Sequence, residues 1–256
     1  MSIIKRGLTS FDLKLIGIIL MVFDHIHQMF YFEGVPLWFT MLGRLVAPIF
    51  LFLSAEGFYY TRNRKKYMLN LLIGFWICQI LFMAVPAILP NSKVELINTI
   101  FGTLFLGLCA MWVYDGFFGK VKYIGKAVLG LLFLIVTPFV TMFVMASQDM
   151  PLIIKQIFIF FIPSVLTVEG GPIFILLALM FHIFRNKKIG TYLTLVLVSL
   201  FIFISSPQND QWMMVFSLLP IYLYNGEEGR KEKWLFYIFY PLHIIVLYLL
   251  STLIFL

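Results

Sequence analysis

Long apolar runs, separated by short polar or charged stretches, dominate the pattern of residues along this chain. The runs lie at residues 11–32, 37–60, 67–89, 97–114, 123–146, 151–166, 171–184, 190–205, 211–224 and 234–256. A helix that crosses the hydrocarbon core of a bilayer needs about 20 predominantly apolar residues, and most of these runs approach that length. They do not alternate apolar and polar positions as the strands of a membrane barrel would. The pattern therefore predicts an all-α fold, a polytopic integral membrane bundle of about nine to ten transmembrane helices.

The composition agrees with this class and excludes an ordinary soluble domain. Of the 256 residues, 62% are hydrophobic and 12% are charged, against about 45–50% and about 25% in soluble proteins. We expect a single membrane domain over residues 1–256, with no soluble domain attached. Cys78 and Cys109 both lie in apolar runs, so we expect packing residues rather than a redox pair or a metal site.

The net charge of +7 comes from cations that gather between the apolar runs. These clusters lie at residues 5–6, 62–66, 120–126, 185–188 and 230–233. Short cationic loops are typical of the cytoplasmic side of a membrane protein. The charge is therefore interpreted as a topology signal, and nucleic acid is not an expected partner.

The same clusters leave two topologies open. With a cytoplasmic N-terminus, the first three clusters lie inside. If the run at 151–166 crosses fully, the chain crosses ten times and the clusters at 185–188 and 230–233 lie outside. If that run is re-entrant or interfacial, about nine crossings result and both clusters lie inside, which the positive-inside rule favours.

Ionisable side chains inside apolar runs are the informative residues, because each costs about 2.5–3.5 kcal/mol on insertion scales. They are Asp24, His25, His27, Arg44, Glu56, Lys155, His182 and His243. His27 is expected near the outer interface, where it is solvated. His182 lies close to Arg185 and is interpreted as an interface residue. The others are candidates for chemistry, for polar contacts between helices, or for both.

His25 is the best candidate general base, because histidine titrates near neutral pH. Asp24 is its neighbour and points about 100° away on a helix, so each must meet a different partner. Arg44 is expected at the same depth as this pair, where it contacts Asp24 or holds an oxyanion, a carboxylate or a phosphate. Pro48 removes a backbone donor and is expected to kink the second helix.

Glu56 follows Arg44 by twelve residues, or about 18 Å of helix, so the two cannot pair. Glu56 is expected near the inner boundary, in a salt bridge with the cations at 62–66 or beside a ligand. Those cations are either a topology signal only or a site for phosphates.

His243 follows Tyr240 and Pro241 and is either a packing residue or part of a site. Glu169 lies in a turn before a helix.

Several segments together resemble the TraX family of F-pilin acetylation proteins, in order and over nearly the whole chain. They are Leu8-Thr-Ser-Phe-Asp-Leu-Lys14, Val22-Phe-Asp-His-Ile26, Gly43-Arg-Leu-Val-Ala-Pro-Ile-Phe50, Ala55-Glu-Gly-Phe58, Thr61-Arg-Asn-Arg-Lys-Lys-Tyr67, Glu169-Gly-Gly171, Tyr224-Asn-Gly226 and Phe239-Tyr-Pro-Leu-His243. The family is similar to the broader superfamily of transmembrane acyltransferases.

The resemblance implies a multi-pass acyltransferase of the bacterial cytoplasmic membrane that takes acetyl-CoA, or a related acyl-CoA, as co-substrate and needs no metal. The first-helix histidine of the family maps onto His25, and we predict a catalytic group of His25, Asp24 and Arg44. The predicted acyl-CoA site comprises Arg62, Arg64, Lys65, Lys66 and Glu56. The predicted acceptor site comprises Glu169, Tyr240 and His243.

The acceptor stays open: an amine or a hydroxyl, on a peptide such as a pilin N-terminus or on a cell-surface glycan. Buried Asp, His, Arg and Glu side chains are also what a proton-coupled secondary transporter needs, and a non-catalytic scaffold for a pilin is a third reading. The sequence predicts membrane lipids as neighbours and gives no oligomeric state.

Overall fold

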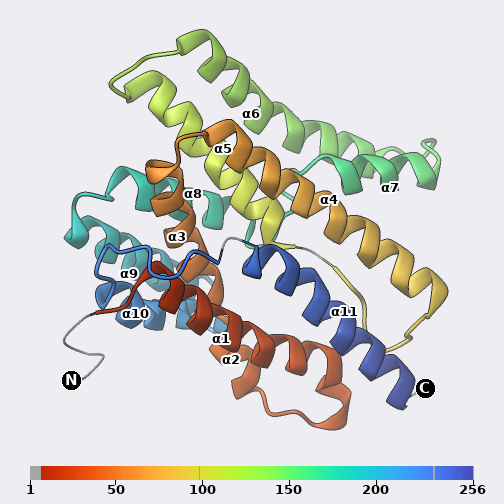
Figure 1. Cartoon of the computed structure of the whole chain (residues 1–256). Helices are drawn as coiled ribbons and strands as arrows, with labels where there is room; N and C mark the ends of the chain where they lie inside the picture. The colour runs from red at the N-terminus through yellow and green to blue at the C-terminus, as the bar shows by residue number, and fades with distance from the viewer. Residues whose placement is uncertain (1–6, 98, 233, 256) are drawn as a thin grey trace. The chain divides into compact units, whose positions relative to one another are not determined.

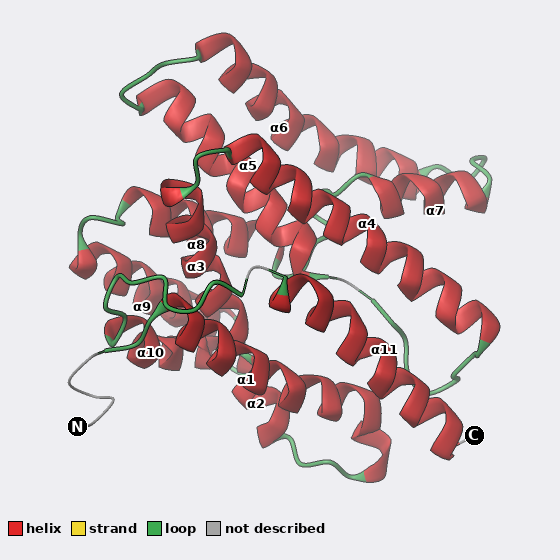
Figure 2. Ribbon diagram, viewed as in Figure 1, coloured by secondary structure: helices red, strands yellow, loops and turns green. Residues whose placement is uncertain are grey.

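The computed structural model describes residues 7–97, 99–232 and 234–255 of the chain (Figure 1). Its elements are α1 (Ser10–Phe30), η2 (Tyr31–Glu33), α2 (Trp38–Gly43), α3 (Val46–Tyr60), α4 (Arg64–Ile88), α5 (Ile100–Phe118), α6 (Ile124–Ala146), α7 (Leu152–Phe161), α8 (Gly171–Ile183), α9 (Lys188–Ser205), η3 (Asp210–Ser217), α10 (Leu218–Tyr222) and α11 (Leu235–Phe255). An isolated bridge joins Leu8 to Tyr224, and the described ranges contain no strand (Figure 2). The all-α prediction is confirmed.

Seven helical stretches in the described residues are long and apolar enough to cross a membrane. They are α1 with η2, α2 with α3, α4, α5, α6, α9 and α11. Two apolar helices, α7 and α8, are shorter. The run predicted at 211–224 forms the short elements η3 and α10, so the number of full crossings stays a prediction. The cations at positions 5, 6 and 233 lie outside the described residues.

The chain divides into two compact units. Unit 1 consists of residues 1–53, 81–97 and 187–256, and unit 2 consists of residues 54–80 and 98–186. The prediction of one domain over the whole chain stays a prediction. Each unit holds its own group of polar side chains, and each is described by itself below.

The first helix of unit 1, α1, starts with a capping box at Thr9. The backbone N–H of Asp12 donates to Thr9 Oγ1 (3.3 Å), and the Thr9 N–H donates back to Asp12 Oδ2 (2.9 Å). This capping box satisfies two of the N–H groups that a helix leaves unpaired at its first turn. α1 then packs against both α2 and α11, so it can present side chains to two neighbours.

The second predicted helix is interrupted between α2 and α3, around Arg44 and Leu45. Pro48 has no N–H and would clash with the carbonyl four residues before it, so a continuous helix is unfavourable here. Pro48 instead lies in the first turn of α3, where proline is tolerated. The predicted kink is confirmed, and it places Arg44 at an irregular point of the backbone.

In unit 2, α5 lies at the centre and packs against α6 and α8. Small residues allow the close approach. An added Cβ at Gly107 would lie 3.0 Å from the Ala178 side chain on α8, and one at Gly116 would lie 2.5 Å from Ala127 on α6. The start of α6 therefore lies beside the end of α5.

α7 and α8 form an interrupted segment within unit 2. α7 has ten residues, about 15 Å of helix, which is half the thickness of the hydrocarbon core. Its C-terminal carbonyl, on Phe161, accepts a 2.8 Å hydrogen bond from Trp76 Nε1, twelve residues into α4. The Glu169 carbonyl, just before α8, accepts from Thr103 Oγ1 at 2.7 Å. Such side-chain donors satisfy backbone that is irregular at membrane depth.

The contacts at the far end of α8 bring two cationic stretches to the same end of unit 2. His182 on α8 and Arg64 at the start of α4 both contact Asp115, near the end of α5. The cations at 62–66 and at 185–186 therefore lie at one end of unit 2. This geometry favours the topology in which residues 151–166 do not cross fully.

This sidedness is testable by cysteine labelling. Cys78 and Cys109 are free and buried, and both are first replaced by serine. Lys65→Cys and Asn186→Cys are then expected to react with a membrane-impermeant maleimide from the same side. Gln148→Cys, beyond the other end of α6, is expected to react from the opposite side. Labelling of positions 65 and 186 from opposite sides would contradict the arrangement.

Candidate functional site

The two histidines that sequence reasoning singled out at the ends of the chain meet in unit 1. His243 Nε2 on α11 lies 2.9 Å from His25 Nδ1 on α1, within hydrogen-bond distance. His243 Nδ1 lies 2.7 Å from the Phe239 carbonyl oxygen, and His25 Nδ1 lies 3.0 Å from the Met21 carbonyl oxygen. Both of these hydrogen-bond contacts of the His25 ring thus use Nδ1.

These contacts assign the protons on both rings. A carbonyl oxygen only accepts, so His243 Nδ1 carries a hydrogen, and in the neutral ring its Nε2 offers a lone pair. His25 Nδ1 must then carry the hydrogen that it shares between the Met21 carbonyl and His243 Nε2. A neutral His25 is left with its own lone pair on Nε2. That atom is therefore the basic position of the pair.

Aromatic side chains hold the histidine pair in place. The Phe239 ring stacks on His243 with centroids 4.7 Å apart and planes 11° apart. The buried Tyr240 ring packs edge-on against both His25 and His243. The predicted acceptor-site residues Tyr240 and His243 therefore lie with the predicted catalytic His25, whereas Glu169 belongs to unit 2.

Asp24 and Arg44 form a second polar group in unit 1. Thr40 Oγ1 donates to Asp24 Oδ1 at 2.6 Å and accepts from Arg44 Nη2 at 2.7 Å. Arg44 Nη1 donates to Gln211 Oε1 at 3.3 Å. The predicted link between Asp24 and Arg44 therefore runs through the Thr40 hydroxyl. The Arg44 Nε atom is buried, and no acceptor for it exists in the described part of the chain.

Gly43 permits this arrangement. An added Cβ at position 43 would lie 2.3 Å from Asp24 Cγ, closer than any real contact. α2 can therefore approach the Asp24 carboxylate only because residue 43 has no side chain. This explains in physical terms why glycine precedes Arg44 in the sequence.

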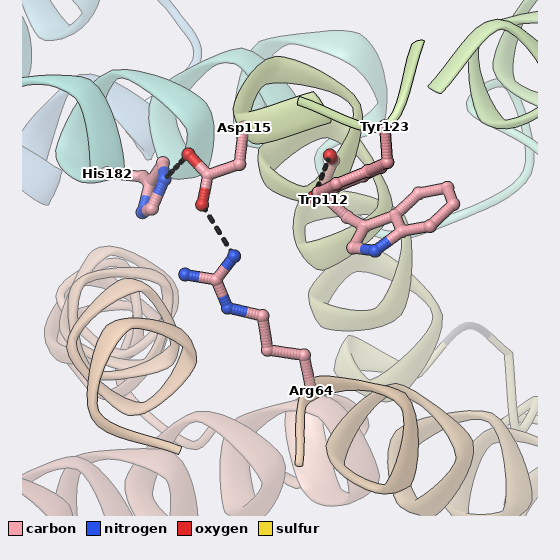
Figure 3. Close-up of polar contacts among 5 residues, drawn as sticks. All are labelled: Arg64, Trp112, Asp115, Tyr123 and His182. Carbon is pink, nitrogen blue, oxygen red and sulfur yellow. Dashed lines mark hydrogen bonds and ion pairs between the residues drawn. The ribbon is translucent and has the colours of Figure 1, made fainter. Parts of the chain in front are cut away.

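A separate cluster in unit 2 has Asp115 at its centre (Figure 3). Arg64 Nη1 lies 2.7 Å from Asp115 Oδ2, and His182 Nε2 lies 2.8 Å from Asp115 Oδ1. The Arg64 guanidinium also lies over the Phe58 ring, 4.4 Å from its centroid. Arg64, predicted to bind acyl-CoA, is thus held by an internal carboxylate and an aromatic face.

Tyr123 borders the same cluster from the turn before α6. Burial raises the pKa of its hydroxyl, and the nearby Asp115 carboxylate raises that pKa further, while Arg64 lowers it. The hydroxyl therefore stays protonated at neutral pH and donates to the Trp112 carbonyl at 2.8 Å (Figure 3).

Glu56, also predicted to contact the co-substrate, forms an ion pair with Arg185 at 2.8 Å. The sequence suggested a partner for Glu56 among the cations at 62–66, whereas Arg185 was interpreted only as a signal of membrane topology. The Arg185 guanidinium lies over Tyr59, 3.6 Å from its centroid, which brings it to the end of α3. Arg62, Lys65 and Lys66, the other predicted phosphate ligands, are exposed at the start of α4.

Four contributors were missed by sequence reasoning. Asp115 falls just outside the predicted apolar run, and His182 was interpreted as an interface residue. Thr40 and Gln211 carry no charge, so nothing in a single sequence marks them. The signal that could have identified Asp115 is its position as an acidic residue directly after an otherwise apolar run.

The fold and these polar groups define a polytopic membrane protein with ionisable side chains paired inside each unit. Comparison with known proteins gives the particular family: residues 10–251 match the TraX protein family, and the chain belongs to it. The chain is also 26% identical over 255 residues to "Probable fimbrial assembly protein FimC, serogroup H1" of Dichelobacter nodosus, covering 93% of this chain and 94% of the relative. No solved structure gives a significant match.

The close contact at Gly43 predicts the effect of a single methyl group. Gly43→Ala is expected to lower the free energy of unfolding by about 1–3 kcal/mol, because overpacking forces α2 away from Asp24. Gly125→Ala is the matched control, since an added Cβ there has no neighbour within 4 Å. Denaturation midpoints in detergent measure both. Equal stability of the two variants would show that Asp24 does not pack against α2.

Proposed function

We propose that this TraX family member is a membrane-embedded acyltransferase that moves an acetyl or short acyl group from acyl-CoA to an amine or hydroxyl. The observation that carries the proposal is the His25–His243 contact, which leaves a lone pair on His25 Nε2. The resemblance to acetylation proteins and the family membership support the same reaction class.

The chemistry follows from that lone pair. The acceptor nitrogen or oxygen forms a bond to the thioester carbonyl carbon, and the carbon–sulfur bond breaks. His25 Nε2 takes the proton from the acceptor and returns it to the departing CoA thiolate, so atoms and charge balance. In a two-step transfer, the same Nε2 would carry the acyl group. His243 acts through His25 and is a positioning residue.

Arg44 is proposed to stabilise the charge that develops on the thioester oxygen. Thr40 and Gln211 hold two of its nitrogens, and its buried Nε–H keeps a hydrogen to donate. A donor fixed before the reaction costs no reorganisation when the oxyanion forms. Asp24 supports this group by accepting the Thr40 hydrogen, so it too is a positioning residue.

The acceptor is proposed to be a surface-exposed polymer subunit, either the N-terminus of a pilin-type protein or a cell-surface sugar. The fimbrial relative, which matches along nearly its whole length, supports the pilin. The bacterial cytoplasmic membrane is the proposed location, with the N-terminus inside.

Substitution of His25 tests the proposal. Nanodisc-embedded protein is incubated with ¹⁴C-acetyl-CoA and an envelope fraction from cells that lack the gene, and label in that fraction is counted. His25→Ala is expected to lower the transfer rate at least about 100-fold, the loss typical of a missing general base. His27→Ala, on the same helix, is the matched control and is expected to transfer normally.

The positioning role of His243 gives a second readout in the same assay. His243→Gln is expected to lower kcat about tenfold with an unchanged KM for acetyl-CoA, because it misorients the base without touching the donor. Full transfer by folded His25→Ala protein would refute the assignment. Proton-coupled flux in liposomes, without acyl transfer by the wild-type protein, would instead favour a transporter.

A further inference from the structure

The segment that follows α9 in unit 1 is wound in an unusual way. η3 (Asp210–Ser217) is a 3₁₀-helix of eight residues, and it continues directly into the α-helix α10. 3₁₀-helices rarely exceed three or four residues because their hydrogen bonds are poorly aligned, and longer stretches often mark a hinge or a strained segment. The length of η3 therefore marks it as a segment for which a second conformation is accessible.

The 3₁₀ winding places Gln211 on Arg44. Residues three apart lie in one row along a 3₁₀-helix, and Gln211, Met214 and Ser217 form such a row. Met214 and Ser217 are fully buried, and Gln211 Oε1 accepts from Arg44 Nη1 at 3.3 Å. The Gln211 amide nitrogen makes a weak contact of 3.8 Å with Met214 Sδ in the same row. The position of this amide thus depends on how η3 is wound.

An α-helical form of the same segment would turn Gln211 away from Arg44. Each step from Ser217 back to Gln211 turns the chain by about 120° in a 3₁₀-helix and by about 100° in an α-helix. With Ser217 fixed, rewinding turns residue 211 by about 120° out of the buried row and draws it about 3 Å toward Ser217. The amide cannot stay on Arg44 Nη1 through this movement.

The two ends of the segment allow the rewinding. The Leu223 N–H donates to the Leu219 carbonyl in α10, and the Leu223 carbonyl accepts from the Leu8 N–H at 2.8 Å, so the C-terminal end is anchored. Residues 206–209, which join α9 to η3, are exposed. Eight residues shorten from about 16 Å to about 12 Å when a 3₁₀-helix becomes an α-helix. The exposed link takes up this change.

A buried hydroxyl beside η3 supplies an independent observation. α9 packs against η3, and Ser199 on α9 is only 3% exposed. Its Oγ has no hydrogen-bond partner in the described part of the chain, although a serine within a helix can bond to the carbonyl four residues before it. Buried polar atoms are nearly always paired. The 3₁₀ form thus leaves a polar neighbour unsatisfied, and a rotated η3 presents different side chains to α9.

We infer that η3 is a two-state element, in which a 3₁₀ form holds Gln211 on Arg44 and an α form withdraws it. The inference rests on the proposed function only for its consequence, because Arg44 is the proposed stabiliser of the thioester oxyanion. The α form removes one of the two contacts that fix the guanidinium, so it is the resting form. A thioester oxygen that accepts from Arg44 Nε favours the 3₁₀ form, and this coupling is reciprocal.

Crosslinking within η3 distinguishes the two forms. Side chains four residues apart are neighbours in an α-helix, but they are turned by about 120° from each other in a 3₁₀-helix. Full-length protein in nanodiscs, with Cys78 and Cys109 replaced by serine, carries Trp212→Cys and Phe216→Cys. A short bifunctional methanethiosulfonate then bridges the two thiols only while they are adjacent. Single variants treated with a monofunctional reagent establish that both thiols are accessible.

Bridging at positions 212 and 216 is expected to be measurable but slower than in the matched control. The control is Leu219→Cys with Leu223→Cys, which has the same spacing in α10 and stays α-helical. Acetyl-CoA is expected to slow bridging at 212 and 216 about fivefold or more, the usual size of a coupling between sites. It is expected to leave the control pair unchanged.

The bridged protein connects the winding of η3 to Arg44. Bridging at 212 and 216 locks the α form and is expected to lower kcat for acyl transfer about tenfold, the effect of one hydrogen bond. A reductant that removes the bridge restores kcat. Met213→Cys with Phe216→Cys, three residues apart and compatible with the 3₁₀ form, is expected to transfer normally when bridged. In Gln211→Ala protein the contact is already absent, so bridging at 212 and 216 lowers kcat no further.

The outcomes separate this inference from the proposed function. The inference alone is overturned by accessible thiols at 212 and 216 that never bridge, or that bridge as fast as the control pair. Full transfer by the bridged α form, or bridging that acetyl-CoA leaves unchanged in a protein that transfers acyl groups, also overturns it. Slow bridging at 212 and 216 in a protein without acyl transfer overturns the proposed function and leaves the two-state η3 standing.

Discussion

The constraint behind this structure is the cost of leaving a polar group unpaired where water is scarce. Each ionisable side chain in the apolar runs must find a partner from another helix, and those partners fix how the helices meet. In unit 1 the His25–His243 contact joins α1 to α11, and the Thr40 hydroxyl joins Asp24 to Arg44. In unit 2 Asp115 joins α4, α5 and α8. The groups that hold the helices are therefore the same groups that can carry chemistry.

The two units contain different sets of polar side chains. Unit 1 contains a histidine whose Nε2 keeps a lone pair and an arginine whose buried Nε–H has no acceptor in the described part of the chain, and the proposed acyl transfer would use both. Unit 2 contains an arginine and a histidine that both contact Asp115, with the exposed cations Arg62, Lys65 and Lys66 beside them in the sequence. In both units a histidine is oriented by a hydrogen bond to one ring nitrogen. The ring nitrogen that contacts the partner carries the hydrogen, so the other nitrogen keeps the lone pair. In His25, which contacts His243 through Nδ1, the lone pair is on Nε2. In His182, which contacts Asp115 through Nε2, the lone pair is on Nδ1.

The helical fold was predictable because apolar runs of about 20 residues have few alternatives in a membrane. His25, Arg44 and His243 were predictable as rare polar residues in such runs, and the break near Pro48 followed from the missing N–H. The partners were not predictable, because pairing depends on which helices are neighbours. Glu56 pairs with Arg185, 129 positions away, although the cations at 62–66 are nearer in the sequence. Thr40 and Gln211 are uncharged and carry no such signal. The interruption between α7 and α8 also depends on Trp76 and Thr103, which are distant in the sequence.

The assignment of protons to the histidine pair is the central claim, and nitrogen NMR tests it most directly. The chain has four histidines, so ring-¹⁵N-histidine labelling of the full-length protein in nanodiscs gives a small set of signals. His27→Ala and His182→Gln variants assign them. Above neutral pH, His25 and His243 are both expected to carry the hydrogen on Nδ1, with His25 Nε2 unprotonated. A hydrogen on Nε2 of neutral His25 would contradict this assignment, because the lone pair would then be absent from the position where the proposed acyl transfer needs it.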